Sequence, residues 1–155
     1  AASAAEAASF VEAMFFVDAA SFTDAVSFVG ATSFGGAALF VRRVEERYGP
    51  KRCAVCGALP AVVQAAHIRP VAEDGSDWDG NGIWLCQNHH SLFDAGIWSI
   101  RPGDLAVVPA DGYDLSSLLM DKSDLKHLSA TPFPDALEWR WEWFQKRANA
   151  DTPVA

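Results

Sequence analysis

The sequence contains few cysteines: three in 155 residues, at Cys53, Cys56 and Cys86. An odd number in so short a chain does not make a framework of paired disulfides, which excludes the class of small secreted domains that depend on one. Two of the three form a C-x-x-C pair, which is typical of metal binding or of redox chemistry in a reducing compartment. The cysteine content therefore predicts a cytoplasmic protein.

Basic residues are absent from the first part of the chain. Residues 1–41 contain four acidic residues but no lysine or arginine, so they lack the basic region that opens a secretory signal. The chain has a formal net charge of -8, which argues weakly against a protein that coats nucleic acid non-specifically. Residues 42–52, however, hold five basic residues against two acidic ones, and such a local patch can contact phosphates.

Long apolar runs are also scarce. Residues 25–41 lack charged side chains, and their length is at the lower limit for a membrane span. Their glycine, serine and threonine content makes them only weakly apolar, so we expect no span there. Half of all residues are hydrophobic and six are tryptophans, which predicts a globular domain with a core rather than a disordered chain.

The first forty residues repeat with a period of six. Phenylalanine recurs at positions 10, 16, 22, 28, 34 and 40. In a helix, six residues advance by about 240°, which spreads these side chains over several faces, whereas an extended chain places them on one face. A β-solenoid of so few turns would be too short to stand alone. We interpret residues 1–38 as a low-complexity tail or the end of a repeat array, with homo-oligomerisation as one role, and residues 39–150 as the folded domain.

Residues 39–150 predict a series of short elements. Residues 39–49 have helical spacing and end at Gly49 and Pro50. Strand-like segments follow at residues 61–68 and 83–86, with a turn-rich stretch between them and a short helix around residues 89–94. Residues 97–108 indicate a hairpin turning at Pro102 and Gly103, and an amphipathic helix opens at Pro134. These elements predict an α+β domain with flanking helices.

Two pairs of potential metal ligands stand in this domain. Cys53 and Cys56 form one pair, Cys86 and His89 form the other, and 29 residues separate them. Together they supply the four ligands of a tetrahedral Cys₃His zinc site. Small buried cysteines beside an unrelated histidine, or a redox pair, are the alternatives, but no βαβ pattern surrounds Cys53. We predict a structural zinc ion, because a closed four-ligand site leaves no coordination position for a substrate.

Three further motifs follow one another in order. They are AAHIRP at residues 65–70, NGIWLC at 81–86 and HHSLFDAG at 89–96. Together with the zinc ligands, they resemble the HNH endonuclease family, and most closely its subgroup in modification-dependent restriction enzymes. The match covers about residues 50–100. The resemblance implies a ββα-metal fold, in which a two-stranded hairpin and a helix hold one divalent ion.

The resemblance also implies a role for each motif residue. His67 would be the general base that takes a proton from the attacking water, which suits a histidine at neutral pH. Asn81 would brace the loop and orient His67. His90 would bind the catalytic ion, and Asp94, one helical turn later, can point at the same ion; such a ligand pair suits Mg²⁺ or Mn²⁺. Taken singly, each residue has an ordinary structural interpretation, and it is their order that favours a nuclease.

The sequence departs from the family pattern at Ala66. Many members carry an aspartate or histidine there as a further metal ligand, so the protein ligands of the catalytic ion reduce to His90 and Asp94. Asp74, Asp77 and Asp79 are candidate replacements, although solvated turn residues are the simpler interpretation. The candidate contacts to the phosphate backbone are Arg42, Arg43, Lys51, Arg52 and Arg69, with a solvated helix face as the alternative.

These features predict a metal-dependent endonuclease that hydrolyses phosphodiester bonds in DNA, in the restriction of foreign or modified DNA. By family analogy, the cut leaves 5′-phosphate and 3′-hydroxyl ends. Two alternatives stay open. One is a zinc-stabilised module that binds nucleic acid without cutting it, which Ala66 favours, and the other is a toxin-type HNH DNase. The sequence does not distinguish DNA from RNA, and it does not identify the modification or site that is recognised.

Overall fold

The computed structural model describes residues 32–150 of the chain. The chain divides into two compact units, residues 1–35 and 36–155, and the side-chain contacts described below are all made within the second. Residues 1–31, which hold most of the phenylalanine repeat and the first part of the weakly apolar segment at 25–41, lie outside the described residues. In the described part, no helix is both long enough and apolar enough to cross a membrane.

Helix α2 spans Thr32–Tyr48. Phe40 and Val44, one turn apart, are buried on its inner face. The helix ends at Gly49, whose φ of 77° lies in the left-handed region that favours glycine. The prediction of a helix at residues 39–49 is confirmed, but the helix begins at Thr32, inside the segment interpreted as a tail. The last residues of the repeat are therefore helical rather than extended.

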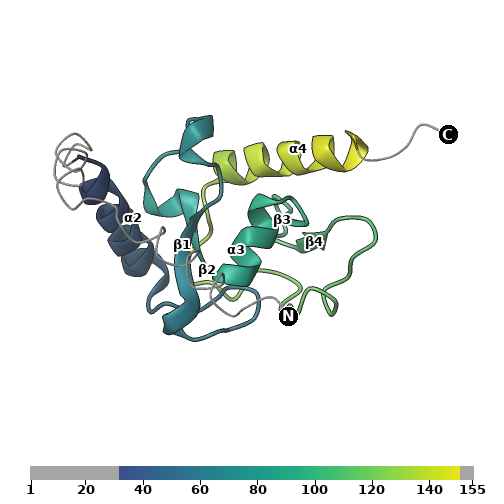
Figure 1. Ribbon diagram of the computed structural model, residues 1–155, viewed down its shortest axis with the longest axis horizontal. Coiled ribbons are helices and arrows are strands. Elements are labelled where there is room, and N and C mark those ends of the chain that lie inside the picture. Colours follow the sequence, from purple (N-terminus) through teal and green to yellow (C-terminus); the bar gives the residue numbers. More distant parts are fainter. Residues whose placement is uncertain (1–31, 151–155) are drawn as a thin grey trace, which may run out of the picture. The chain divides into compact units, whose positions relative to one another are not determined.

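Strands β1 (Val63–His67) and β2 (Gly82–Cys86) form an antiparallel pair, and helix α3 (Gln87–Asp94) follows β2 directly. The register sets Val63 opposite Cys86 and His67 opposite Gly82. Every residue of β2 is buried, because the strand lies in the interior of the domain. The predicted ββα core is thus present (Figure 1). Residues 68–81, which we call the β1–β2 loop, contain two short 3₁₀ helices, Val71–Glu73 and Asp79–Asn81.

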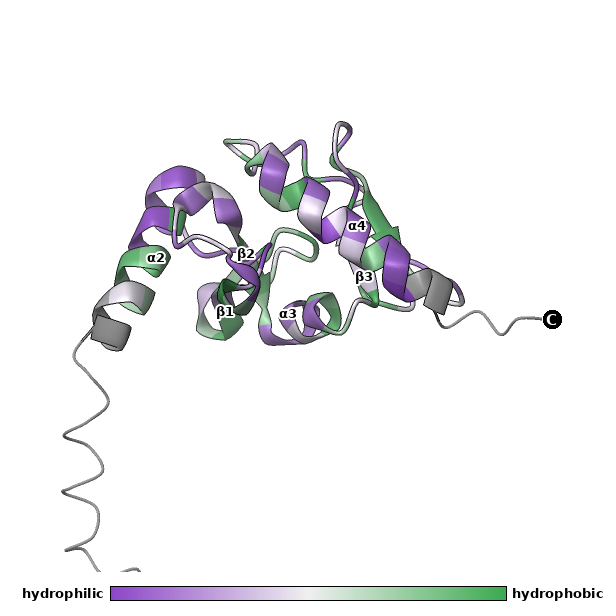
Figure 2. Cartoon of the chain, turned by 90° about the horizontal axis from the view of Figure 1, so that it is seen from above, coloured by the Kyte–Doolittle hydropathy of each residue, from purple (hydrophilic) through white to green (hydrophobic). Residues whose placement is uncertain are grey.

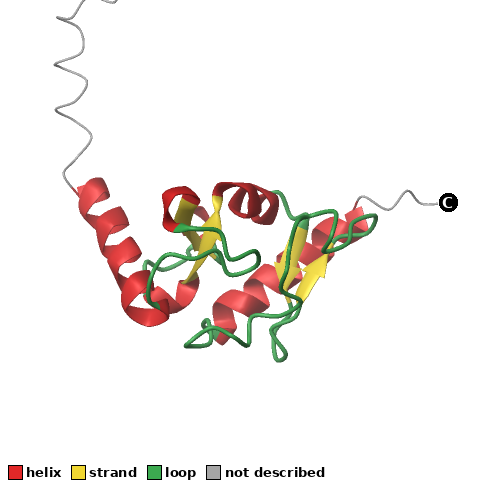
Figure 3. Cartoon of the chain, turned by 90° about the horizontal axis from the view of Figure 1, so that it is seen from below, coloured by secondary structure: helices red, strands yellow, loops and turns green. Residues whose placement is uncertain are grey.

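A second antiparallel pair, β3 (Trp98–Ile100) and β4 (Val107–Pro109), forms a separate sheet. This pair is the hairpin predicted at residues 97–108. Helix α4 (Pro134–Ala150) packs against β3, as Figure 3 shows. Its first residue is proline, which is well tolerated at a helix start because the first N–H groups have no intrahelical partner.

The core runs without interruption from α2 through both sheets. Ile83, Leu85, Phe93 and Trp98 are all fully buried within it. Figure 2 shows hydrophobic residues interleaved with hydrophilic ones along α4, as expected for a helix with one buried face. One charged residue of α4, Arg140, is nevertheless only 1% exposed.

Candidate functional site

The Cys₃His cluster consists of Cys53, Cys56, Cys86 and His89. One potential ligand atom from each residue lies within 4.8 Å of the other three. Nδ1 of His89 is 3.1 Å from Sγ of Cys86 and 3.6 Å from Sγ of Cys53. The cysteines are free thiols rather than a disulfide. Three thiols and an imidazole converging on one point form the donor set of a tetrahedral zinc site, so this cluster can hold a zinc ion.

Hydrogen bonds orient the imidazole of His89 toward the three sulfurs. Nε2 lies 2.9 Å from the carbonyl oxygen of Leu118 and donates its proton to it. Nδ1 is therefore the nitrogen that faces the cysteines, and it can offer its lone pair to a metal ion once its proton is displaced. Trp98 reinforces this position by donating its indole N–H to the carbonyl of His89 at 3.1 Å.

The pKa values of the residues in the Cys₃His cluster depend on the charges of their neighbours in the cluster. Burial opposes a thiolate at Cys53, but hydrogen bonds from His89 and backbone groups outweigh it and lower the pKa to about 6. Burial also opposes the imidazolium of His89, yet the hydrogen bond with Cys53 raises its pKa to about 9. Burial and the neighbouring thiolates raise the pKa of Cys56 to about 12. A metal ion that binds here must displace the protons of Cys56 and His89.

His90 faces away from this cluster and pairs with Asp94. Nε2 of His90 is 3.4 Å from Oδ2 of Asp94, one turn later on α3. Its other nitrogen, Nδ1, is 3.3 Å from Oε1 of Gln64 on β1. An amide oxygen only accepts, so Nδ1 donates its proton to Gln64. Nε2 is then the nitrogen that faces the Asp94 carboxylate.

Within the described residues, no third acidic, cysteine or histidine side chain joins His90 and Asp94. Ala66 is fully buried in β1 and offers no ligand atom. The three aspartates considered as replacements have other partners. Asp74 pairs with Arg69, Asp77 with His67 and Asp79 with Arg47. In this structure, none of these three aspartates joins His90 and Asp94.

His67 lies at the end of β1 between an aromatic ring and a carboxylate. The ring of Phe40 stacks on its imidazole with a centroid separation of 3.8 Å and an angle of 6° between the planes. Nε2 of His67 is 3.0 Å from Oδ1 of Asp77 in the β1–β2 loop. The His67 side chain remains 26% exposed, so a water molecule can reach it.

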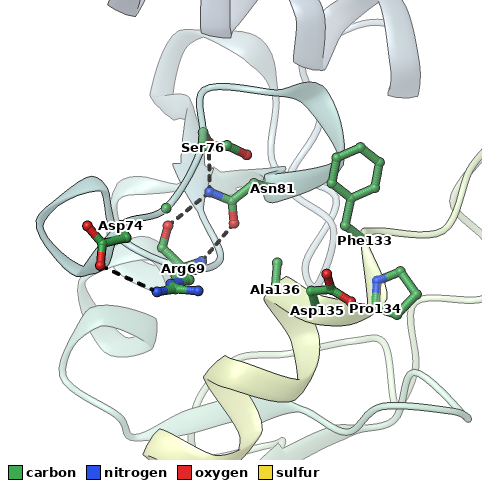
Figure 4. Close-up of a pocket in the computed structure, with 9 residues that line it drawn as sticks. Arg69, Asp74, Ser76, Asn81, Phe133, Pro134, Asp135 and Ala136 are labelled. Carbon is green, nitrogen blue, oxygen red and sulfur yellow. Dashed lines mark hydrogen bonds and ion pairs between the residues drawn. The ribbon is translucent and has the colours of Figure 1, made fainter.

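Asn81 holds the β1–β2 loop together through its side chain. Its Oδ1 accepts the backbone N–H of Arg69 at 2.9 Å, and its Nδ2 donates to the carbonyls of Arg69 and Ser76. Asn81 is 1% exposed and lies at the edge of a pocket of about 360 Å³ between this loop and the start of α4 (Figure 4). The amide thus fixes the segment that follows His67, which is the geometry required of a brace.

His67 and the His90–Asp94 pair have no hydrogen bond or ion pair with each other in the described part of the chain. Gln64 and His67 are three residues apart on β1 and so point to opposite faces of the strand. One face reaches α3 through Gln64, and the other reaches α2 through Phe40. His67 and the His90–Asp94 pair therefore belong to the same ββα unit but do not touch each other.

The basic residues proposed as phosphate contacts differ in exposure and in the partners that their side chains already have. Arg42 and Arg52 are exposed, and Arg42 pairs only with Glu46 of its own helix. Arg43 donates to the carbonyl of Asp77 at 2.9 Å, and Arg69 bonds the carbonyl of Glu73, so both also stabilise the β1–β2 loop. Lys51 lies 5.6 Å from the centre of the Trp84 ring.

Comparison with known proteins shows which family the chain resembles. A family model described as HNH endonuclease matches residues 53–101, the segment that carries the Cys₃His cluster, His67, Asn81 and His90. The chain therefore resembles the HNH endonuclease family over residues 53–101. A solved structure titled "Modification dependent TagI restriction endonuclease" is similar to the chain, with 29% sequence identity and a TM-score of 0.55. No curated protein matches the chain.

The similarity to the TagI structure covers 68% of this chain but only 37% of that protein. The chain therefore spans little more than a third of the restriction enzyme it resembles. The chain thus resembles both the HNH endonuclease family and a modification-dependent restriction enzyme, as the sequence motifs predicted.

Sequence reasoning missed three residues that contact the site residues, Phe40, Gln64 and Asp77, and a fourth, Arg140, that bonds the carbonyl of Phe93 next to Asp94. Asp77 was considered only as a replacement metal ligand, and Phe40 was counted in the repeat and in the helix at residues 39–49 without a role at the site. Gln64 directly precedes the AAHIRP motif, and its place on the same strand face as Ala66 was a usable signal. Arg140 gave no signal, because nothing in the sequence of an amphipathic helix indicates that one arginine is buried.

Proposed function

We propose that the chain is a metal-dependent endonuclease that hydrolyses phosphodiester bonds in DNA, acting in the restriction of foreign or modified DNA. The observation that carries the proposal is the placement of the HNH residues on a ββα unit. His67 ends the first strand, and His90 and Asp94 share one side of the helix. Asn81 bonds the loop that joins the two strands.

His67 is the proposed general base. A water molecule attacks phosphorus, the imidazole takes the proton of that water, the bond from phosphorus to the 3′ oxygen breaks, and the leaving 3′ oxygen takes a proton from solvent water. The products are a 5′-phosphate and a 3′-hydroxyl. Partial exposure of the His67 side chain supports this role, because a base must meet both water and substrate. Asn81 keeps the loop beside it in place during the reaction.

His90 and Asp94 are the proposed ligands of the catalytic ion. Nε2 of His90 and the Asp94 carboxylate lie 3.4 Å apart on one side of α3, close enough for both to bind one cation. An imidazole nitrogen beside a carboxylate oxygen fits Mg²⁺ or Mn²⁺. His90 and Asp94 would hold a divalent ion there, which would supply Lewis-acid polarisation of the scissile phosphate and stabilisation of the leaving oxygen. Gln64 fixes the ring of His90 in the ligating orientation.

The Cys₃His cluster is proposed to hold a structural zinc ion. It uses the residue directly before His90, so the same turn of α3 belongs to two metal sites. A closed cluster that connects the Cys53–Gly57 turn to the start of α3 would fix the position of that helix relative to the hairpin. This would set the orientation of His90, the next residue, and of Asp94, one turn further along α3.

The proposal is tested by plasmid cleavage. We expect nicking with Mg²⁺ or Mn²⁺, none with EDTA, and a preference between plain and modified DNA. His67→Ala should slow cleavage by about 10²–10⁴-fold, the usual contribution of a positioned base. The matched control is His127→Ala, since His127 is exposed and lies outside the HNH domain. Equal rates for the two variants would contradict the assignment of His67.

The same experiment separates two alternatives. A zinc-stabilised binding module would retain DNA in a mobility-shift assay but cut none with any ion, and the absence of a ligand at Ala66 is the feature that supports it. A toxin-type DNase would cut plain and modified DNA alike. The named similarity to a modification-dependent restriction enzyme favours restriction over this second alternative.

A further inference from the structure

Helix α2 lies before the segment matched by the HNH family model, yet it contacts the proposed base. Phe40 of α2 stacks face to face on His67, with ring centroids 3.8 Å apart. The ring is buried, with 3% of its surface exposed. This stack keeps the imidazole of His67 parallel to the Phe40 ring. It does not by itself prevent the imidazole from turning within its own plane.

The backbone opposite His67 is shaped to accept this stack. Gly82 is the register partner of His67 on β2. A Cβ built on Gly82 would lie 2.7 Å from Cζ of Phe40 and 2.6 Å from Cγ2 of Val44, closer than such atoms approach. Glycine at this position therefore makes room for the Phe40 ring beside His67.

Asp77 restricts the remaining rotation. Its Oδ1 lies 3.0 Å from Nε2 of His67, and Arg43 of α2 holds the backbone of Asp77 through a 2.9 Å hydrogen bond to its carbonyl. A carboxylate has no proton to give at neutral pH, so Nε2 is the donor in this pair. Nδ1 of His67 then keeps its lone pair, and it makes no hydrogen bond within the described residues.

We propose that Asp77 is a positioning residue for the nuclease reaction: with Phe40 it clamps His67 as the Nε2–H tautomer, so that Nδ1 is the nitrogen that accepts the proton of water. Helix α2 is thereby part of the catalytic unit, since it supplies both Phe40 and the arginine that holds Asp77. The inference rests on the proposed role of His67 as the base. It gives Asp77 a function different from the metal ligation considered from the sequence.

The test compares Asp77→Ala and Asp77→Asn with wild type. Asp79→Asn is the matched control, because Asp79 lies in the same loop but pairs with Arg47 rather than His67. For each protein we would measure melting temperature, kcat and KM for DNA cleavage, and the ¹⁵N spectrum of the His67 ring nitrogens. The ring spectrum reports the tautomer directly and does not depend on activity.

We expect Asp77→Ala to lower kcat by about 10- to 100-fold with KM little changed, the pattern of a misoriented catalytic group. Its ring spectrum should show a loss of the pure Nε2–H form. Asp77→Asn should keep that form, because the amide oxygen still accepts the proton, and should retain an intermediate kcat. Asp79→Asn should leave the tautomer and kcat at wild-type values.

Two results would overturn the inference. One is an Asp77→Ala protein with the wild-type tautomer and kcat, and the other is equal losses in Asp77→Ala and Asp79→Asn, which would indicate a general effect on the loop. Failure of the proposed function looks different, because wild type itself would then cut no DNA with any metal. The ring spectra of Asp77→Ala and wild type would still decide whether Asp77 sets the tautomer.

Discussion

His89 and His90 are adjacent in sequence but use opposite ring nitrogens toward their proposed metals. His89 donates from Nε2 to the Leu118 carbonyl and turns Nδ1 toward the cysteines. His90 donates from Nδ1 to Gln64 and turns Nε2 toward Asp94. Successive helix residues point about 100° apart, so one turn of α3 can serve two sites with separate tasks.

Alanine substitutions of the two histidines should therefore fail in different ways. His89→Ala removes one of four proposed zinc ligands, so it should lower zinc content and melting temperature together, because a structural zinc ion contributes directly to folding. His90→Ala should keep one zinc ion per chain and a near-native melting temperature but lose Mn²⁺-dependent nicking. Elemental analysis, thermal melting and plasmid nicking measure the three quantities.

Each of the two variants is the control for the other, because the two substitutions are at neighbouring positions of one helix. If both proteins lose zinc and stability, or if both stay folded with zinc bound and lose only cleavage, then a single site uses the pair. Either result would contradict the division of the two histidines between a structural and a catalytic ion.

At the scale of elements, α4 holds the end of α3 through one buried arginine. Arg140 donates to the carbonyl of Phe93 and stacks against the rings of Phe93 and Trp143, with its guanidinium carbon 3.9 Å and 4.4 Å from their centres. Burial lowers the pKa of Arg140 to about 10, and the charge of Asp94 partly opposes this shift. A positive charge at the C-terminal end of a helix is also favoured by the helix dipole.

Arg140→Ala should lower the free energy of unfolding by about 2–4 kcal/mol, because it removes a charge-assisted hydrogen bond and leaves a void in the core. Arg140→Met, which keeps much of the volume, should fall between Ala and wild type. Denaturant unfolding measures both. The control is Lys146→Ala on the same helix, whose exposed pair with Glu142 should contribute less than about 0.5 kcal/mol. An Arg140→Ala protein as stable as this control would show that α4 does not depend on the arginine.

The elements themselves could be predicted from the sequence, and the contacts between them could not. Glycine and proline positions marked the end of α2, the turn of the second hairpin and the start of α4, and the cysteine spacing marked the cluster. The pairing of His67 with Asp77 depends on the path of an irregular loop, which carries no hydrophobic period. The stack of Phe40 on His67 and the bond from Arg140 to Phe93 join distant segments, and their formation depends on tertiary packing.

At the scale of the whole molecule, the boundary of the nuclease unit is wider than the segment matched by the family model. Residues 53–101 hold the motifs, but α2 supplies the Phe40 stack and α4 supplies Arg140. Phe40 and Val44 also belong to the core. The minimal folded unit therefore includes α2, whereas residues 1–31 carry no proposed ligand or catalytic group.

Two truncations test this boundary. Removal of residues 1–31 should leave melting temperature, zinc content and cleavage close to those of the full chain, since α2 begins at Thr32. Removal of residues 1–48 should unfold the domain, because the loss of one buried phenylalanine side chain alone costs about 3–5 kcal/mol against a total stability of about 5–15 kcal/mol. Circular dichroism melts and plasmid nicking measure the outcome. If the shorter truncation failed to fold, the repeat would be part of the core; if the longer one folded and cut DNA normally, α2 would have no role in stability or in holding His67.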